Sequence, residues 1–165
     1  MTAVGLVCAL LLFIPIKMLR RQQRRSQERT RLLTLFHRET THEKRLDLAF
    51  VLLENNEYQI DGLEAAVPAL KEIFTTTLER ALGDKQHRIR GMAASHLGAL
   101  QDISVVPLLI NALDDDHAYV RSCAALGLGR LRAVEARDRL KVVSEQDWDQ
   151  TVRSRAREAL ERIRE

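Results

Sequence analysis

The sequence is poor in the residues that build turns and aromatic cores. Its 165 residues include 7 Gly, 3 Pro, 1 Trp, 2 Tyr and 4 Phe. β-Sandwiches and barrels need frequent turn residues, and low-complexity chains are rich in Gly and Pro. Because 45% of the residues are hydrophobic, the chain can still bury a core. The composition therefore predicts an all-α protein.

Cysteine is also scarce. Cys8 and Cys123 lie far apart and form no CxxC pair, so the chain encodes neither a disulfide framework nor a cysteine zinc site. The sequence contains no HExxH, GxSxG or glycine-rich phosphate loop. We therefore expect a binding protein rather than an enzyme, with no cofactor and no bound metal.

Charged residues are absent from Met1 to Ile16, and Ala3–Ile16 is almost entirely apolar. As a helix these sixteen residues would extend roughly 24 Å, which spans most of a bilayer if the Lys17 stem reaches the headgroups. We predict a transmembrane signal anchor over residues 1–19. Two alternatives remain: a cleaved secretory signal, disfavoured because no basic residue precedes the apolar run, and a buried core helix.

A basic segment follows the apolar run. Residues 17–38 carry eight Lys and Arg against the single acid Glu28, a net +7, so the rest of the chain carries −4 of the formal total of +3. We predict a basic juxtamembrane helix over residues 20–40. The cations lie only after the apolar run, which places the N-terminus outside and the body in the cytoplasm of a single-pass protein of the plasma or inner membrane. The residues expected to contact anionic lipid are Lys17, Arg20, Arg21, Arg24 and Arg25; alternatively they act only as a topology signal on a solvated face.

Three segments in the second half are similar: residues 82–100, 113–131 and 145–163, with periods of 31 and 32. Each consists of an acidic turn and then an amphipathic helix, and further helices are predicted between them at residues 105–113 and 134–143. Gly98 and Gly129 would let neighbouring helices approach closely. Helix pairs repeated at this period imply a stack. The residues that recur in register are Asp84, Asp115 and Asp147; Arg90, Arg121 and Arg153; Ala93, Ala124 and Ala156; and Leu97, Leu128 and Leu160.

The pattern D-x-x-x-x-[VI]-R-x-x-A-[AR]-x-x-L resembles HEAT repeats, specifically the short class also found in phycobilisome lyase-type proteins. The resemblance covers roughly residues 68–165. It implies a short α-solenoid of HEAT-like helix pairs over residues 41–165. The N-terminal transmembrane helix predicted from the apolar run precedes this solenoid. The resemblance also implies a structural ladder between adjacent repeats, formed by Asp84, Arg90, Asp115, Arg121, Asp147 and Arg153.

The densest polar cluster is residues 114–117, which we interpret as a solvated turn in preference to a divalent-cation site. Trp148 lies in the next acidic turn, either as an exposed contact for a partner or packed on the preceding helix. His96 is expected to be a buried, satisfied histidine. The candidate contacts for a protein partner are Asp116, His117, Tyr119 and Trp148.

These features favour a membrane-anchored scaffold or adaptor that binds membrane-associated proteins, such as an accessory subunit of a membrane complex. Two alternatives belong to other functional classes, an enzyme and a nucleic-acid-binding protein. A bilin lyase-type enzyme rests on the repeat resemblance alone. Nucleic-acid binding is disfavoured because the body is acidic and aromatic residues are few.

Overall fold

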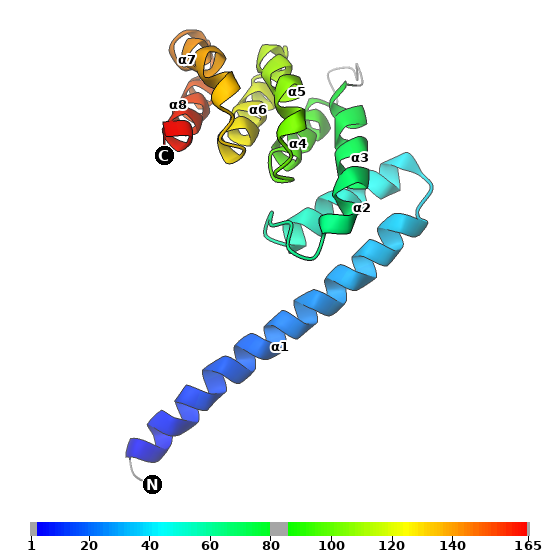
Figure 1. Ribbon diagram of the computed structural model, residues 1–165, viewed down its shortest axis with the longest axis vertical. Coiled ribbons are helices and arrows are strands. Elements are labelled where there is room, and N and C mark those ends of the chain that lie inside the picture. Colours follow the sequence, from blue (N-terminus) through cyan, green and yellow to red (C-terminus); the bar gives the residue numbers. More distant parts are fainter. Residues whose placement is uncertain (1–2, 80–85, 165) are drawn as a thin grey trace. The chain divides into compact units, whose positions relative to one another are not determined.

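The computed structural model describes the backbone of residues 3–79 and 86–164, and the side chains from residue 19 onward within those ranges. The chain divides into two units, Met1–Asn56 and Glu57–Glu165. Within the described residues all regular structure is helical, as the composition predicts (Figure 1). The α-helices are α1 Ala3–Arg38, α2 His42–Asn55, α3 Val67–Glu79, α4 His87–Leu97, α5 Val106–Asn111, α6 Ala118–Arg130, α7 Arg137–Gln146 and α8 Gln150–Arg164, and the 3₁₀ turns are η1 Glu64–Ala66, η3 Ile103–Val105, η4 Ala112–Asp114 and η5 Val134–Ala136.

The first unit consists of α1 and α2. One continuous helix, α1, extends across the boundary between the predicted anchor and the predicted basic helix. Phe36 of α1 is fully buried, and the Arg45 guanidinium of α2 lies over its ring, 4.8 Å from the centroid. Arg29 donates a hydrogen bond of 3.4 Å to the side chain of Asn56. These contacts hold the C-terminal part of α1 against α2.

The predicted anchor, residues 1–19, lies outside the residues whose side chains are described, apart from Leu19, which is 58% exposed. Lys17 is also outside them. Among the described residues, no helix combines the length and the apolar character needed to cross a membrane. The four predicted lipid contacts that are described, Arg20, Arg21, Arg24 and Arg25, are all exposed on α1.

The second unit is a stack of helix pairs in two layers (Figure 1). Helices α4, α6 and α8 pack side by side in one layer, while α3, α5 and α7 pack against them from the other. The layer of α4, α6 and α8 is built from small residues: its recurring alanines Ala93, Ala124 and Ala156 are all fully buried. Small side chains let helix backbones approach closely, so these helices meet almost backbone to backbone.

The helices of the other layer differ in detail from the sequence prediction. The helix predicted at residues 105–113 is a short α5 between the two 3₁₀ turns η3 and η4. The helix predicted at residues 134–143 begins as η5 and continues as α7 to Gln146. At one of these starts, the Asp102 carboxylate accepts a hydrogen bond of 2.9 Å from the Ser104 backbone N–H and caps the first turn.

Candidate protein-binding surfaces

An arginine–aspartate ladder joins successive repeats at the N-terminal ends of α4, α6 and α8. Arg90 of α4 donates to both carboxylate oxygens of Asp115, at 3.1 and 3.0 Å. Arg121 of α6 makes the same two-pronged contact with Asp147, at 2.8 and 3.0 Å. Each arginine therefore reaches forward to the acidic turn of the following repeat, and the paired fork geometry fixes the spacing of the stack.

Arg121 and Arg153 also bind the acidic turn of their own repeat. Arg121 donates to the carbonyl oxygen of Asp115 at 2.9 Å, and Arg153 donates to that of Asp147 at 2.7 Å. Asp84, the first predicted member of the ladder, lies outside the described residues. The structure thus brings together two carboxylate–arginine pairs of the predicted ladder, and it places Arg153 in hydrogen-bond contact with the backbone carbonyl of Asp147.

The ladder carboxylates are stabilised in their charged form. Burial acts to raise the pKa of Asp147, but hydrogen bonds from Arg121 and from the Asp149 backbone N–H outweigh it and leave the pKa below its usual value. For Asp115, burial is likewise outweighed by the hydrogen bond from Arg90, and the pKa is lowered. Both pairs are therefore ionic at neutral pH.

Trp148 is the most exposed aromatic residue among the predicted partner contacts. Its side chain is 74% exposed in the turn before α8, so it does not pack on the preceding helix as one interpretation proposed. The Arg121 guanidinium, fixed by Asp147, lies 5.0 Å from the centroid of its ring. Trp148 also lines a groove of about 300 Å³ together with the Arg121–Asp147 pair and residues of α7. We refer to this groove and its tryptophan as the ladder groove.

The other three predicted contacts lie at the start of α6. Asp116 is exposed and its carboxylate is 3.2 Å from Arg90. The ring of His117 stacks on His87 with centroids 4.3 Å apart, so one of its faces is covered. Tyr119 is 44% exposed. These residues flank the ladder on the same end of the layer as Trp148.

The acidic cluster before α6 is used for ion pairing. Asp114 pairs with Arg139, and Asp115 and Asp116 both pair with Arg90. Among the residues that the structure describes, no three His, Cys, Asp or Glu side chains are grouped so that they could hold a metal ion. The cluster is thus occupied by arginines.

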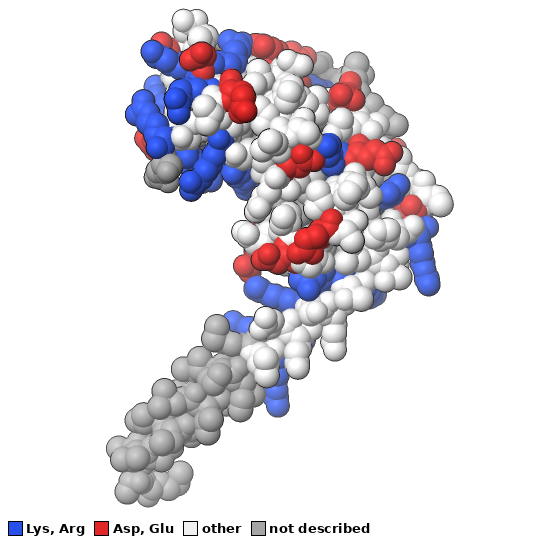
Figure 2. Space-filling model, viewed as in Figure 1, with Lys and Arg blue, Asp and Glu red and all other residues white. Residues whose placement is uncertain are grey.

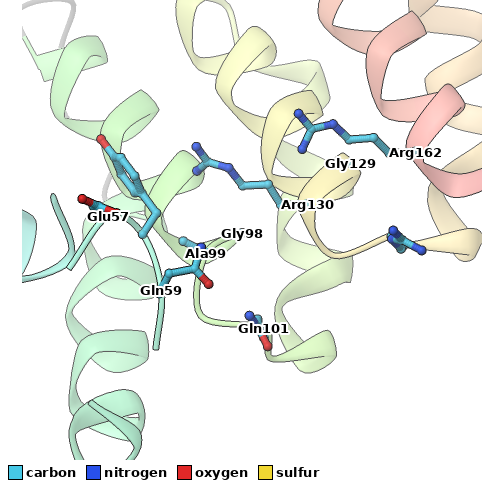
Figure 3. Close-up of a pocket in the computed structure, with 10 residues that line it drawn as sticks. Glu57, Gln59, Gly98, Ala99, Gln101, Gly129, Arg130 and Arg162 are labelled. Atoms are coloured by element: carbon cyan, nitrogen blue, oxygen red, sulfur yellow. The ribbon is translucent and has the colours of Figure 1, made fainter. Parts of the chain in front are cut away.

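A larger cavity of about 570 Å³ opens at the opposite, C-terminal ends of α4, α6 and α8 (Figure 3). We call it the arginine cavity. Figure 3 shows Arg130 and Arg162 extending from neighbouring helices above the backbone of Gly98 and Ala99. The residues that line it are Glu57, Tyr58, Gln59, Gly98, Ala99, Gln101, Gly129, Arg130, Arg132 and Arg162.

Arg130 is held in a defined position in this cavity. Its Nη1 donates to the carbonyl oxygen and the hydroxyl of Ser95, at 3.0 and 3.1 Å, and its guanidinium lies 4.9 Å from the centroid of the Tyr58 ring. Burial lowers the pKa of Arg130, and the positive charge of Arg162 lowers it further. The cavity therefore gathers positive charge that its own residues only partly compensate.

Sequence reasoning missed the arginine cavity. Arg130 and Arg162 occupy the same position in successive repeats, 32 residues apart, as do the aligned arginines of the ladder. This periodicity was available as a signal. What the sequence lacks is any indication that Tyr58, from the loop after α2, covers one side of Arg130.

His96 belongs to α4 and lies in the protein core beside the arginine cavity. It is 3% exposed, as expected for a buried histidine. Its Nδ1 is 2.7 Å from the carbonyl oxygen of Met92, and its ring contacts those of Tyr58 and Phe74, at centroid distances of 5.3 and 5.5 Å. Desolvation by burial lowers its pKa from 6.5 to about 4. The folded protein therefore keeps this imidazole neutral at pH values where the unfolded chain protonates it.

This histidine should make stability depend on pH in mildly acidic solution. Because the folded pKa is depressed, the unfolded state binds more protons as the pH falls, and we expect a loss of about 2 kcal/mol between pH 7 and pH 5. Urea denaturation at a series of pH values measures it. In His96→Leu the slope over this interval should largely disappear, and an unchanged slope would mean that another group is responsible.

A family model of HEAT repeats matches residues 75–161, more than half of the chain. The chain belongs to the HEAT-repeat family. No curated protein matches it significantly. The HEAT match begins within α3 and ends within α8, and the residues of the arginine–aspartate ladder lie inside the matched range. It does not distinguish the phycobilisome lyase-type class from other HEAT repeats.

Proposed function

We propose that this HEAT-repeat protein is a scaffold that binds a protein partner and has no catalytic role. We further propose that residues 1–19 anchor it in the plasma or inner membrane, with the N-terminus outside and the repeats in the cytoplasm, as an accessory subunit of a membrane complex. The stack supports the first part, because α-solenoids present extended, rigid surfaces for protein contacts. The apolar run and the arginines that follow it support the second.

The observation that carries the proposal is the exposed but positioned indole of Trp148. Asp147, the residue before it, is fixed by two hydrogen bonds from Arg121, and Arg121 also lies over the ring. Tryptophan is enriched among the residues that dominate binding energies, and one that is already oriented loses little conformational freedom on binding. The adjoining groove offers a partner further surface beside the ring.

The experiment compares Trp148→Ala with a matched control. Ile103→Ala serves as the control because Ile103 is also 74% exposed but lies at the start of η3, away from the ladder groove. Membranes containing each full-length variant are washed with alkaline carbonate, solubilised in mild detergent and affinity-purified. Companion proteins are then quantified by mass spectrometry.

We expect the full-length protein to remain in carbonate-washed membranes and to purify with a defined set of companions. Trp148→Ala should weaken their recovery by at least tenfold, since a central aromatic contact contributes about 2 kcal/mol. Ile103→Ala should leave recovery unchanged. Equal recovery with all three proteins would remove the ladder groove from the proposal, and release by carbonate would remove the anchor.

A further inference from the structure

The arginine cavity lies at the opposite end of α4, α6 and α8 from the ladder groove, and the scaffold proposal does not use it. Three of its ten lining residues are arginines and only one, Glu57, is acidic. The surrounding region is basic as well: α8 has five arginines against two glutamates. Figure 2 shows Lys and Arg side chains gathered over α7 and α8. This concentration contrasts with the acidic balance of the chain after residue 38.

The positive charge of Arg162 is only partly neutralised within the protein. Its guanidinium donates to Glu158 at 2.8 Å, but Arg155 donates to the same carboxylate at 2.8 Å. One acid is therefore shared by two arginines. Arg130, for its part, uses one nitrogen for Ser95, which leaves further N–H donors of its planar fork for a ligand.

The backbone of the cavity also departs from what stability alone favours. Gln101 and Arg132 follow α4 and α6 at equivalent positions, with φ values of 56° and 50°. Glycine is favoured in this left-handed conformation after a helix, because a Cβ there is strained. Both positions instead carry a polar side chain that lines the cavity. Strain retained at such a position is consistent with a functional demand for those side chains.

We propose that the arginine cavity binds an acidic segment of a protein partner in the polyproline II conformation, with carboxylates at every third residue. Arg130 and Arg162 project from adjacent helices of one layer, whose axes lie about 8–10 Å apart. A polyproline II chain advances about 3.1 Å per residue with three residues per turn, so side chains three residues apart point to the same face and match that spacing. Arginine forks bind carboxylates through paired hydrogen bonds.

An acidic peptide suits the cavity better than single-stranded RNA. RNA-binding grooves use aromatic faces on which bases stack. Among the described residues that line the cavity, Tyr58 is the one aromatic, and its ring already contacts Arg130 and the ring of His96. The cavity thus presents fixed cations without an open stacking surface.

The test uses the purified full-length protein in mild detergent and a fluorescein-labelled peptide in which Glu recurs at every third position between Gly and Ser. A peptide with Gln in place of Glu, and a labelled single-stranded RNA, are measured in parallel by fluorescence anisotropy. The key variants are Arg162→Gln and Arg155→Gln. They are closely matched, because both residues belong to α8, bind Glu158 and are similarly exposed, at 44% and 45%, yet only Arg162 lines the cavity.

We expect the Glu peptide to bind and the Gln peptide not to bind. Arg162→Gln should weaken binding about fivefold and Arg155→Gln by less than twofold. Arg132→Gly provides a second test that unfolding cannot mimic: it should weaken binding while raising the melting temperature, because glycine relieves the left-handed backbone.

Absence of Glu-peptide binding, equal losses in the two α8 variants, or tighter binding of RNA with the same dependence on Arg162 would each overturn the inference. The inference rests on the scaffold proposal only in that the peptide belongs to a protein partner. If the peptide fails to bind while companion capture still depends on Trp148, the inference is wrong and the scaffold proposal stands.

Discussion

Replacing Arg121 by methionine is expected to destabilise the repeat stack by about 4 kcal/mol, since removal of one partner from a buried ion pair leaves the other charge uncompensated. The side chains of Arg121 and Asp147 are both 7% exposed. Without the guanidinium, the Asp147 carboxylate retains the hydrogen bond from the Asp149 backbone N–H, at 2.8 Å, and loses two charge-assisted bonds. The contacts from Arg121 to the turn before α6 are lost as well.

Urea denaturation followed by circular dichroism measures this effect. Arg155→Met is the control, because Arg155 pairs with Glu158 on the exposed surface of α8 and such pairs contribute at most about 1 kcal/mol. The double variant Arg121→Met/Asp147→Leu should recover part of the loss, because it removes both charges together. If Arg121→Met cost no more than Arg155→Met, the ladder would not be a significant source of stability.

The ladder should also determine how low the pH can fall before the protein unfolds. The folded pKa values of Asp115 and Asp147 are lowered, so their contribution is complete above the unfolded value of about 3.9 and is lost as the pH falls below it. The loss due to His96 occurs at higher pH, below about 6.5. The two contributions are therefore separated on the pH axis.

The second large effect is expected for Gly98→Ala, which should destabilise the protein by about 3 kcal/mol. A Cβ at Gly98 would lie 2.2 Å from the Cα of Gly127 and 2.7 Å from its carbonyl oxygen. Because these are backbone atoms, the clash can be relieved only if α4 and α6 move apart. Such a movement would disturb the buried alanines between them and the ladder at the other end of the same helices.

Gly91→Ala is the matched control on the same helix. A Cβ at Gly91 would meet the side chain of Tyr119, at 2.5 Å, and a half-exposed side chain can move aside. Alanine also favours a helix interior over glycine by about 1 kcal/mol, so this variant should be near neutral in a thermal melt. Similar melting temperatures for the two variants would show that the close approach at Gly98 does not limit the packing.

The repeat architecture could be predicted from the sequence because its determinants recur at a fixed period. Aligned arginines, aspartates and alanines indicated the stack, and the resemblance to HEAT repeats implied that the aligned aspartates and arginines join its repeats. The pairing itself could not be obtained this way, since the alignment does not show that Arg90 contacts Asp115 of the next turn. That pairing depends on the offset between neighbouring helices.

Other features depend on contacts that are not marked by residues recurring at a fixed period in the sequence. The 3₁₀ turns η3 and η5, which precede α5 and α7, arise from local backbone geometry. Trp148 was a candidate partner contact in the sequence, but its exposure follows from the path of one turn. The arginine cavity forms where the C-terminal ends of α4, α6 and α8 meet the loop that carries Tyr58, and this meeting cannot be predicted from single helices.

The most direct test of the scaffold function is photo-crosslinking in intact cells, with p-benzoylphenylalanine in place of Trp148 and, as a control, in place of Ile103. We expect crosslinks from position 148 to one defined, membrane-associated protein and no such product from position 103. Crosslinks to the same proteins from both positions, or none from position 148 in a protein that is folded and membrane-bound, would contradict the scaffold function.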